Sequence, residues 1–385
     1  MRNTVFKWRF EIGIMLVLIG LTLLNVKPYG WNITALFHMD SYVASLDPPP
    51  ENFVVLSVPG FDGEQYYQIA KHIPLLSTQE GRKTLRSLPP GVYAYQRILL
   101  PLTAFILSAG QERGLPYAFL GINLISLMLI FVLMRRLWNV PTLYALALAL
   151  CPAAILGLHF NITEPLTLLL LTLFIGRFRN KETLDFTGSL LLTLILLSRE
   201  VNVLLLGFVT VYLFWRRNWK ALPHLILPAV IFCLWQLVLA SIFGSAPFFM
   251  NTSTGQWPGN GVWTLVTGGY GGITRYSLSA LSILFLLILP GIVWTTGTLQ
   301  RERKIRFLSA GALCFLIVML LLPREVFGSV TGVGRVVTPV YPFLLMEAME
   351  KRSPAARGIA SVILVLGLIT AIGFALTIHP YTLAG

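Results

Sequence analysis

A series of long apolar stretches separated by short polar loops is the feature that most constrains this chain. A helix that crosses a bilayer needs about 20 mainly apolar residues, because each residue adds about 1.5 Å to a crossing of about 30 Å. Eleven stretches approach this requirement: 10–26, 115–134, 141–158, 162–178, 186–199, 201–215, 221–243, 276–298, 305–322, 336–349 and 358–378. The sequence therefore predicts an all-α integral membrane protein with about eleven transmembrane helices, in which each segment satisfies its own backbone hydrogen bonds.

Composition supports this class and argues against others. Of the 385 residues, 56% are hydrophobic and 12% are charged, whereas soluble domains carry about 25% charged residues. The net charge of +13 could suit nucleic acid, but the basic residues form short runs between apolar stretches instead of one basic surface. We therefore expect no nucleic-acid partner. The three cysteines, Cys151, Cys233 and Cys314, all lie in apolar stretches, which indicates small buried side chains.

The basic residues also predict the orientation of the chain, because Lys and Arg favour short loops on the cytoplasmic side. The apolar segment Ile98–Ala109 is short, and it can be either a compressed span or a helix at the membrane interface. If it lies at the interface, 18 of the 29 Lys and Arg residues fall in short loops on the side of the N-terminus. This choice predicts a cytoplasmic N-terminus and two substantial outer loops, 27–114 and 244–275.

The first polar segment of interest is Phe61-Asp62-Gly63-Glu64-Gln65-Tyr66-Tyr67-Gln68-Ile69-Ala70, in loop 27–114. Its helical spacing places Asp62 where a helix begins, so this carboxylate can either cap the helix or act as a general base at the membrane surface. Glu64 faces away from Asp62 on a regular helix, and both could serve one site only if the backbone were irregular at Gly63. The Asp-x-Glu pattern also suits a divalent cation such as Mg²⁺ or Mn²⁺.

Other charged residues lie at the ends of apolar stretches. Arg97 begins the short apolar segment, where it can reach lipid headgroups or form a fork for a phosphate. Glu164 opens the stretch 162–178, and an acid in a first turn is favoured by the helix dipole. His159 is expected to be a polar loop residue rather than a metal ligand.

Two arginine-containing segments complete the set. Arg199 and Glu200 separate two closely spaced apolar stretches, and neither charge is needed for topology. Arg324 and Arg335 flank a segment rich in Gly and Val, and a pair of outer arginines can clamp a phosphate or diphosphate. All these residues come from five separate parts of the chain, yet the predicted topology places them on one face. This convergence predicts an outer polar site for a substrate with a lipid tail, a phosphate and a polar head.

The segment 61–70, followed by Tyr95-Gln96-Arg97-Ile98-Leu99-Leu100-Pro101-Leu102, resembles the signature of membrane glycosyltransferases of the GT-C class. Within that class it is similar to a prokaryotic group distantly related to the GPI mannosyltransferase that adds the second mannose. The resemblance is strongest over residues 55–200. It implies a single polytopic domain over 1–385, with a GT-C-like catalytic module at 1–220 that includes loop 27–114 with interfacial helices, and variable C-terminal helices at 221–385.

The resemblance also implies roles for the polar residues. Asp62, or Glu64 in its place, would be the catalytic carboxylate that deprotonates an acceptor hydroxyl on a glycan, lipid or protein. The donor would be a sugar linked to polyprenyl phosphate and used with inversion. The substrate-binding residues would be Tyr66, Tyr67, Arg97, Glu164, Arg199, Glu200, Arg324 and Arg335, with arginines holding the leaving phosphate. Some members of the class use a divalent cation and others do not, so the metal is left open.

Two other functions compete with this hypothesis. A transporter or flippase for a lipid-linked or anionic solute would place ionisable residues near mid-bilayer, often in repeated halves, whereas here they cluster at one surface without a visible repeat. A non-catalytic subunit of an envelope-polymer complex would tolerate Asp62→Asn. The leading expectation is a multi-pass glycosyltransferase of the plasma (inner) membrane, with membrane lipids and a lipid-linked sugar as partners and an extracytoplasmic active site.

Overall fold

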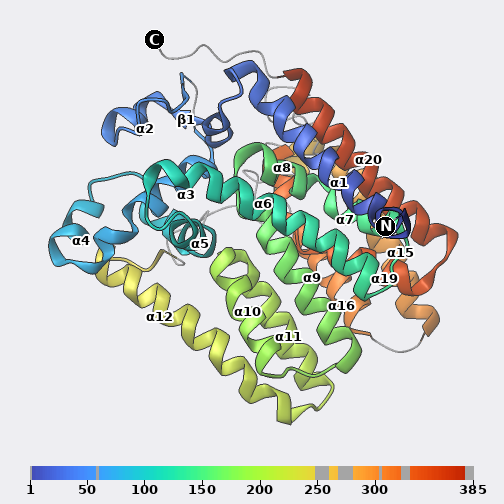
Figure 1. Ribbon diagram of the computed structural model, residues 1–385. Helices are drawn as coiled ribbons and strands as arrows, with labels where there is room; N and C mark the ends of the chain where they lie inside the picture. Colours follow the sequence, from blue (N-terminus) through green and yellow to red (C-terminus); the bar gives the residue numbers. More distant parts are fainter. Residues whose placement is uncertain are drawn as a thin grey trace.

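The computed structural model describes residues 2–57, 60–247, 260–267, 281–302, 306–321 and 330–377, and this part of the chain is almost entirely helical (Figure 1). The bundle helices are α1 (Arg2–Val26), α6 (Leu115–Val132), α7 (Thr142–Ala149), α8 (Pro152–Phe160), α9 (Glu164–Lys181), α10 (Phe186–Ser198), α11 (Val203–Trp215), α12 (Ile226–Phe243), α15 (Leu289–Glu302), α16 (Phe307–Leu320), α19 (Val340–Lys351) and α20 (Pro354–Thr377).

Shorter elements lie between these helices. The short helices are α2 (Ser41–Leu46), α3 (Asp62–His72), α4 (Gln79–Leu85), α5 (Leu99–Leu107), α13 (Asn260–Val266) and α18 (Val330–Val336). Strands β1 (Met39–Asp40) and β2 (Val55–Leu56) pair in parallel. Turns of 3₁₀-helix cover Lys27–Tyr29, Ile33–Phe37, Ile73–Ser77, Val92–Gln96, Glu112–Gly114, Glu200–Asn202 and Trp219–Leu225, and π-helical turns cover Leu133–Leu137 and Leu284–Ile288.

Five helical segments of the described chain are long and apolar enough to cross a membrane: Trp8–Tyr29, Glu112–Leu137, Trp219–Phe243, Leu281–Glu302 and Pro354–Phe374. The pair α7 and α8, bent by 42°, makes a sixth if it is counted as one broken span. The chain is therefore a helical, multi-pass membrane protein. Each of the eleven predicted stretches overlaps helical residues, but the count of eleven spans and the GT-C fold remain predictions.

The break between α7 and α8 follows from the sequence. Pro152 has no backbone N–H, so it ends the hydrogen-bond ladder of α7 and opens α8. Helix α20 passes directly over this break, and a Cβ atom on Gly367 would lie 1.7 Å from the carbonyl oxygen of Leu150. Only glycine allows the backbone of α20 to approach so closely.

The two largest hydrophobic clusters of the described residues hold these elements in place. The larger cluster fills the interior of the helical bundle, from α1 to α20. The second fixes loop 27–114 to the bundle, and at its centre the ring of Phe37 lies 5.3 Å from the rings of both Tyr67 and Phe119. Figure 1 shows the result: α2, α3, α4 and α5 form a separate group at the left, beside the ends of α6 and α12. The residues of α3 and α5 are thus held in fixed positions against the bundle.

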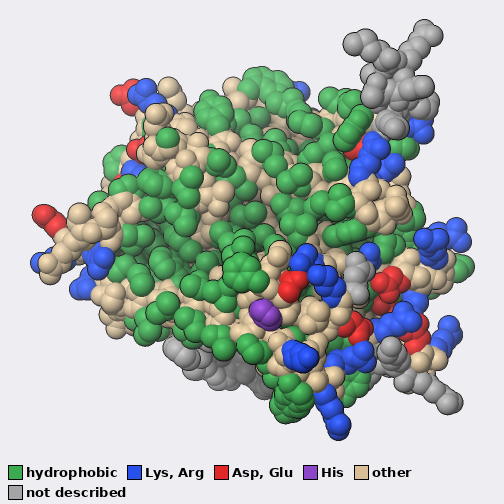
Figure 2. All heavy atoms as spheres, turned by 60° about the horizontal axis from the view of Figure 1, so that its bottom comes forward, with side chains coloured by type: hydrophobic (Ala, Val, Ile, Leu, Met, Phe, Trp, Pro, Cys, Tyr) green, Lys and Arg blue, Asp and Glu red, His purple; other side chains and the backbone are tan. Residues whose placement is uncertain are grey.

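The surface is that of a lipid-embedded protein. Large apolar side chains such as Leu16 on α1, Leu237 on α12 and Ile372 on α20 are exposed. Figure 2 shows a broad hydrophobic surface, with charged side chains gathered in groups toward its margins. Soluble monomers rarely expose apolar patches of this extent, so lipid is the natural cover for this face.

Candidate functional site

Asp62 is the first residue of α3, and its side chain points to arginines instead of capping the helix. Phe61 occupies the N-cap position, so the capping alternative for Asp62 is wrong. One carboxylate oxygen, Oδ2, accepts hydrogen bonds from Nη1 of Arg97 and from Nη2 of Arg335, the latter at 2.6 Å. Burial alone would raise the pKa of Asp62, but the charges of Arg335 and Arg97 outweigh it and hold the pKa well below its usual range. The side chain of Asp62 is 22% exposed, whereas those of Arg97 and Arg335 are 9% and 10% exposed.

Arg97 links Asp62 to a second carboxylate. Its Nε and Nη2 donate to the two carboxylate oxygens of Glu200, each at 2.8 Å, and this bidentate pair fixes the guanidinium plane. The hydroxyl of Tyr93 donates to Glu200 at 2.6 Å, and the hydroxyl of Tyr66 lies 3.2 Å from Nη1 of Arg97. Arg97 is buried, so its side chain does not reach out to lipid headgroups as one alternative predicted.

Glu164 is the centre of the other half of the cluster. It begins α9, as predicted, and is fully buried. Nε of Arg335 and Nη1 of Arg199 both donate to its Oε1, at 2.6 Å and 2.8 Å. The second oxygen of Glu164 and Nε of Arg199 are buried without a hydrogen-bond partner in the described chain. Each of these two atoms has capacity for a further hydrogen bond.

We call this cluster the Asp62 network, and its members are Asp62, Tyr66, Tyr93, Arg97, Glu164, Arg199, Glu200 and Arg335. Its three arginines face three carboxylates, so the formal charges balance. The predicted convergence of five chain segments is thus present as direct contacts. Tyr93 was not among the predicted residues, although its position four residues before Arg97 is a signal that could have identified it.

Glu64 and Tyr67 lie outside this network. Helix α3 is regular through Gly63, so Glu64 faces away from Asp62, and its Oε2 accepts the backbone N–H of Asp40 at 2.5 Å. Tyr67 donates to Glu112 at 2.9 Å and lines a separate hollow of about 600 Å³. Arg324 lies outside the described residues, so the structure does not test its predicted role as half of a phosphate clamp.

The described residues around Asp62 do not fit a divalent cation. Within the described chain, no group of three or more His, Cys, Asp or Glu side chains could hold a metal ion. The two members of the Asp-x-Glu pattern point apart, and the groups nearest to Asp62 are guanidinium ions, which repel a cation. The arrangement is instead suited to an anion.

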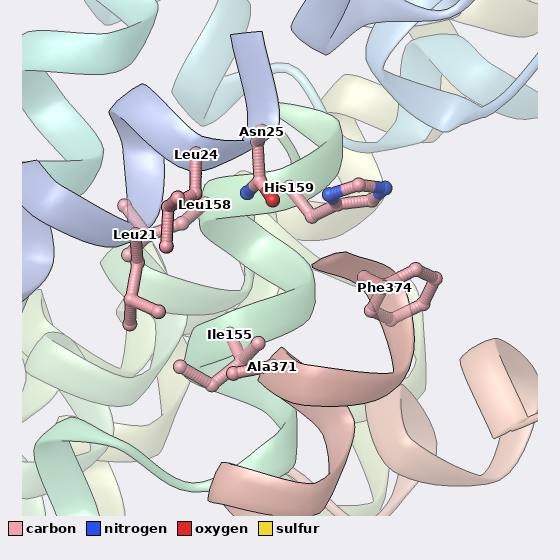
Figure 3. Close-up of a pocket in the computed structure, with 8 residues that line it drawn as sticks. All are labelled: Leu21, Leu24, Asn25, Ile155, Leu158, His159, Ala371 and Phe374. Atoms are coloured by element: carbon pink, nitrogen blue, oxygen red, sulfur yellow. The ribbon is translucent and has the colours of Figure 1, made fainter. Parts of the chain in front are cut away.

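His159 is a helical residue in the interior, contrary to the prediction of a polar loop residue. It lies near the end of α8, where its ring stacks on Phe374 of α20 with 4.3 Å between centroids. Figure 3 shows His159, Asn25 and Phe374 around a small hollow between α1, α8 and α20. The ring centroid of His38 lies 5.3 Å from that of His159. Within the described residues, no third His, Cys, Asp or Glu side chain joins the two histidines to complete a metal site.

Comparisons with known proteins found no match: no family model, no curated protein and no solved structure matches the chain. The resemblance to the GT-C class therefore rests on the segments around Asp62 and Arg97 alone.

Proposed function

We propose that the chain is a GT-C-type glycosyltransferase that moves a sugar from a polyprenyl-phosphate donor to an acceptor hydroxyl at the outer face of the plasma membrane. The observation that carries the proposal is a partly exposed carboxylate, Asp62, held by two buried arginines, Arg97 and Arg335. These are the two kinds of group that the reaction needs: a base for the hydroxyl and cations for the leaving phosphate.

In the resting protein Asp62 is a weak base, because Arg97 and Arg335 stabilise its charged form. A phosphate offers the same arginines a stronger, bidentate partner. When the donor phosphate takes the guanidinium groups of Arg97 and Arg335, Asp62 is released toward the acceptor and its pKa rises. Binding of the donor thus switches on the base.

The chemical step then needs one proton acceptor and one anion-binding group. The acceptor oxygen forms a bond to the anomeric carbon of the sugar, from the side opposite the phosphate, so the configuration inverts. The bond between the anomeric carbon and the phosphate oxygen breaks, and its electron pair leaves with polyprenyl phosphate. The hydroxyl proton passes to Asp62, while Arg97 and Arg335 stabilise the charge that develops on the leaving group.

The remaining members of the network position these groups. Glu200 holds Arg97 by two hydrogen bonds, and Glu164 holds both Arg335 and Arg199. Because Glu164 and Glu200 are buried, they keep the arginines charged and oriented while Asp62 moves away. Nε of Arg199, which has no described partner, offers one more donor for the phosphate.

The test is sugar transfer by the purified protein from a panel of polyprenyl-phosphate sugars, with Asp62→Asn and Glu64→Gln compared to wild type. Loss of a general base lowers transfer by about 10²–10⁴-fold, so Asp62→Asn should show a loss of this size. Glu64→Gln is the matched control on the same helix, and it should stay within a few-fold of wild type.

Two outcomes would count against the proposal. Full activity of Asp62→Asn would remove Asp62 from the reaction. If wild type and Asp62→Asn bind polyprenyl phosphate and neither turns over any donor, the transporter, flippase or scaffold alternatives move ahead. The unfolding midpoint of each variant, measured in parallel, separates loss of catalysis from loss of the fold.

A further inference from the structure

A second group of arginines lies at the other end of the bundle. Arg135, Arg352 and Arg357 line an open hollow of about 780 Å³, together with Asn139 and Tyr144. The candidate span Glu112–Leu137 runs between the two ends, since Glu112 bonds Tyr67 of α3 and Arg135 lies in the last turn. The hollow and the Asp62 network are therefore separated by the length of a membrane-spanning helix.

These three arginines have no carboxylate partner within ion-pair distance in the described chain. Nη1 of Arg135 donates to the hydroxyl of Thr142 at 2.8 Å, which holds the guanidinium at the hollow but leaves its charge uncompensated. Their sequence neighbours differ: Arg136 pairs with Glu11 at 2.7 Å, and Lys351 pairs with Glu302. Among these five basic residues, the three without a carboxylate partner are thus the ones that line the hollow.

The start of α20 adds to the positive potential of the hollow. Ser353 caps this 24-residue helix by accepting the backbone N–H of Ala356 at 3.1 Å. Arg352 and Arg357 lie on either side of this first turn, where the helix dipole also favours an anion. Three uncompensated guanidinium groups and a helix N-terminus match an anion with several oxygens, and a phosphate has that chemistry.

We infer that this hollow binds the phosphate of an anionic phospholipid headgroup. It opens at the end of membrane-spanning helices, and the apolar residues Val140, Pro141 and Leu143 share its lining. Basic pockets between transmembrane helices at the level of the headgroups bind anionic lipids. The inference is independent of the proposed glycosyl transfer, because it involves neither Asp62 nor any other member of the network.

The experiment measures lipid binding to the full-length protein in detergent by native mass spectrometry. Wild type should retain added phosphatidylglycerol in preference to zwitterionic phosphatidylcholine. The double variant Arg352→Gln with Arg357→Gln should bind phosphatidylglycerol about 10–30-fold more weakly, because each basic residue near a headgroup contributes about a factor of five. Arg177→Gln is the matched control, since Arg177 lies near the C-terminal end of α9 but is already paired with Asp185 at 2.5 Å.

Each result supports or overturns the inference. Equal binding of the two lipids, or unchanged phosphatidylglycerol binding in the double variant, overturns it. If inorganic phosphate alone raises the unfolding midpoint of wild type as much as phosphatidylglycerol does, the site serves a soluble phosphate and the lipid assignment is wrong. Should the double variant fail to fold, Arg135→Gln tests the same hollow from the π-helical turn that follows α6, with the same expected direction.

Discussion

The two ends of the bundle hold the same kind of residue in opposite electrostatic states. In the Asp62 network every arginine is buried and bonded to a carboxylate. In the hollow at the start of α20, Arg352 and Arg357 are exposed and have no carboxylate partner in the described chain. Arg97 and Arg335 of the network can therefore bind an anion in place of Asp62 only by breaking an internal ion pair, whereas the hollow can accept one directly. Arginines that are already paired thus bind an anion in exchange for an internal carboxylate, whereas unpaired arginines bind an anion without such an exchange.

The largest expected difference between the two ends is in the free energy of unfolding after one charge is removed from each end. Glu164→Gln leaves Arg199 and Arg335 without their shared partner in a buried site, and this loss destabilises a protein by about 3–5 kcal/mol. Arg352→Gln removes an exposed, unpaired charge and should change the free energy of unfolding by about 0.5 kcal/mol or less. Both values can be measured by titration of the purified protein with a denaturing detergent. Equal effects of the two substitutions would contradict the comparison.

Two glycines provide a test of packing at the same two ends. A Cβ on Gly63 would lie 2.0 Å from the carbonyl oxygen of Phe160, so Gly63→Ala should push α3 away from α8 and destabilise the protein by about 1–3 kcal/mol. Gly358 in α20 has open space around it, and Gly358→Ala should stabilise the helix by about 0.5–1 kcal/mol.

The readouts for this pair are the free energy of unfolding and sugar transfer. Because Gly63 directly follows Asp62, its substitution should lower both, whereas Gly358→Ala should leave transfer unchanged. If Gly63→Ala had wild-type stability, the close contact between α3 and α8 would not be needed to position Asp62.

The sequence was sufficient to predict the helical class and the grouping of the polar residues, whereas the count of eleven spans and the orientation remain predictions. Apolar stretches of suitable length marked the helices, and the positive-inside rule placed Asp62, Arg97, Glu164, Arg199 and Arg335 on one face, where the structure joins them. The grouping of these residues could be predicted because a charge is costly inside the bilayer and therefore tends to lie at the end of an apolar stretch.

The sequence could not predict which arginine bonds which carboxylate in the Asp62 network. Which carboxylate each arginine bonds depends on the rotation of α9 and α18 and on contacts between residues far apart in sequence, such as Arg335 with Asp62. The burial of His159 was missed because its partners, Phe374 and His38, are distant along the chain. The uncompensated state of Arg352 was also hidden, since its neighbour Lys351 is paired and the two look alike in sequence.

The two acids of α3 should respond to pH in opposite directions. Burial raises the pKa of Glu64 from 4.5 to about 7, although the hydrogen bond from the Asp40 amide opposes the shift. The folded protein therefore holds a proton that the unfolded chain releases, and stability should fall as the pH rises from 4.5 through 7. Asp62, whose folded pKa is lowered, contributes stability that is lost only as the pH falls toward strongly acidic values.

The measurement for this pair is the unfolding midpoint between about pH 5 and pH 8. Wild type should lose stability across this range, and Glu64→Gln should flatten the curve, because the amide keeps an oxygen for the Asp40 N–H without a charge. An unchanged slope in Glu64→Gln would assign the pH dependence to other groups.

The smallest expected effect is a difference in salt sensitivity between the two ends. Salt screens exposed charges over about 10 Å at 0.1 M and about 3 Å at 1 M, whereas buried pairs are screened much less. Raising NaCl across this range should therefore weaken phosphatidylglycerol binding at Arg352 and Arg357 by several-fold. The stability difference between wild type and Glu164→Gln should stay nearly constant, because the partners of Glu164 are buried. If that difference also shrank with salt, water would have access to the interior of the Asp62 network, and its arginines would resemble those of the hollow.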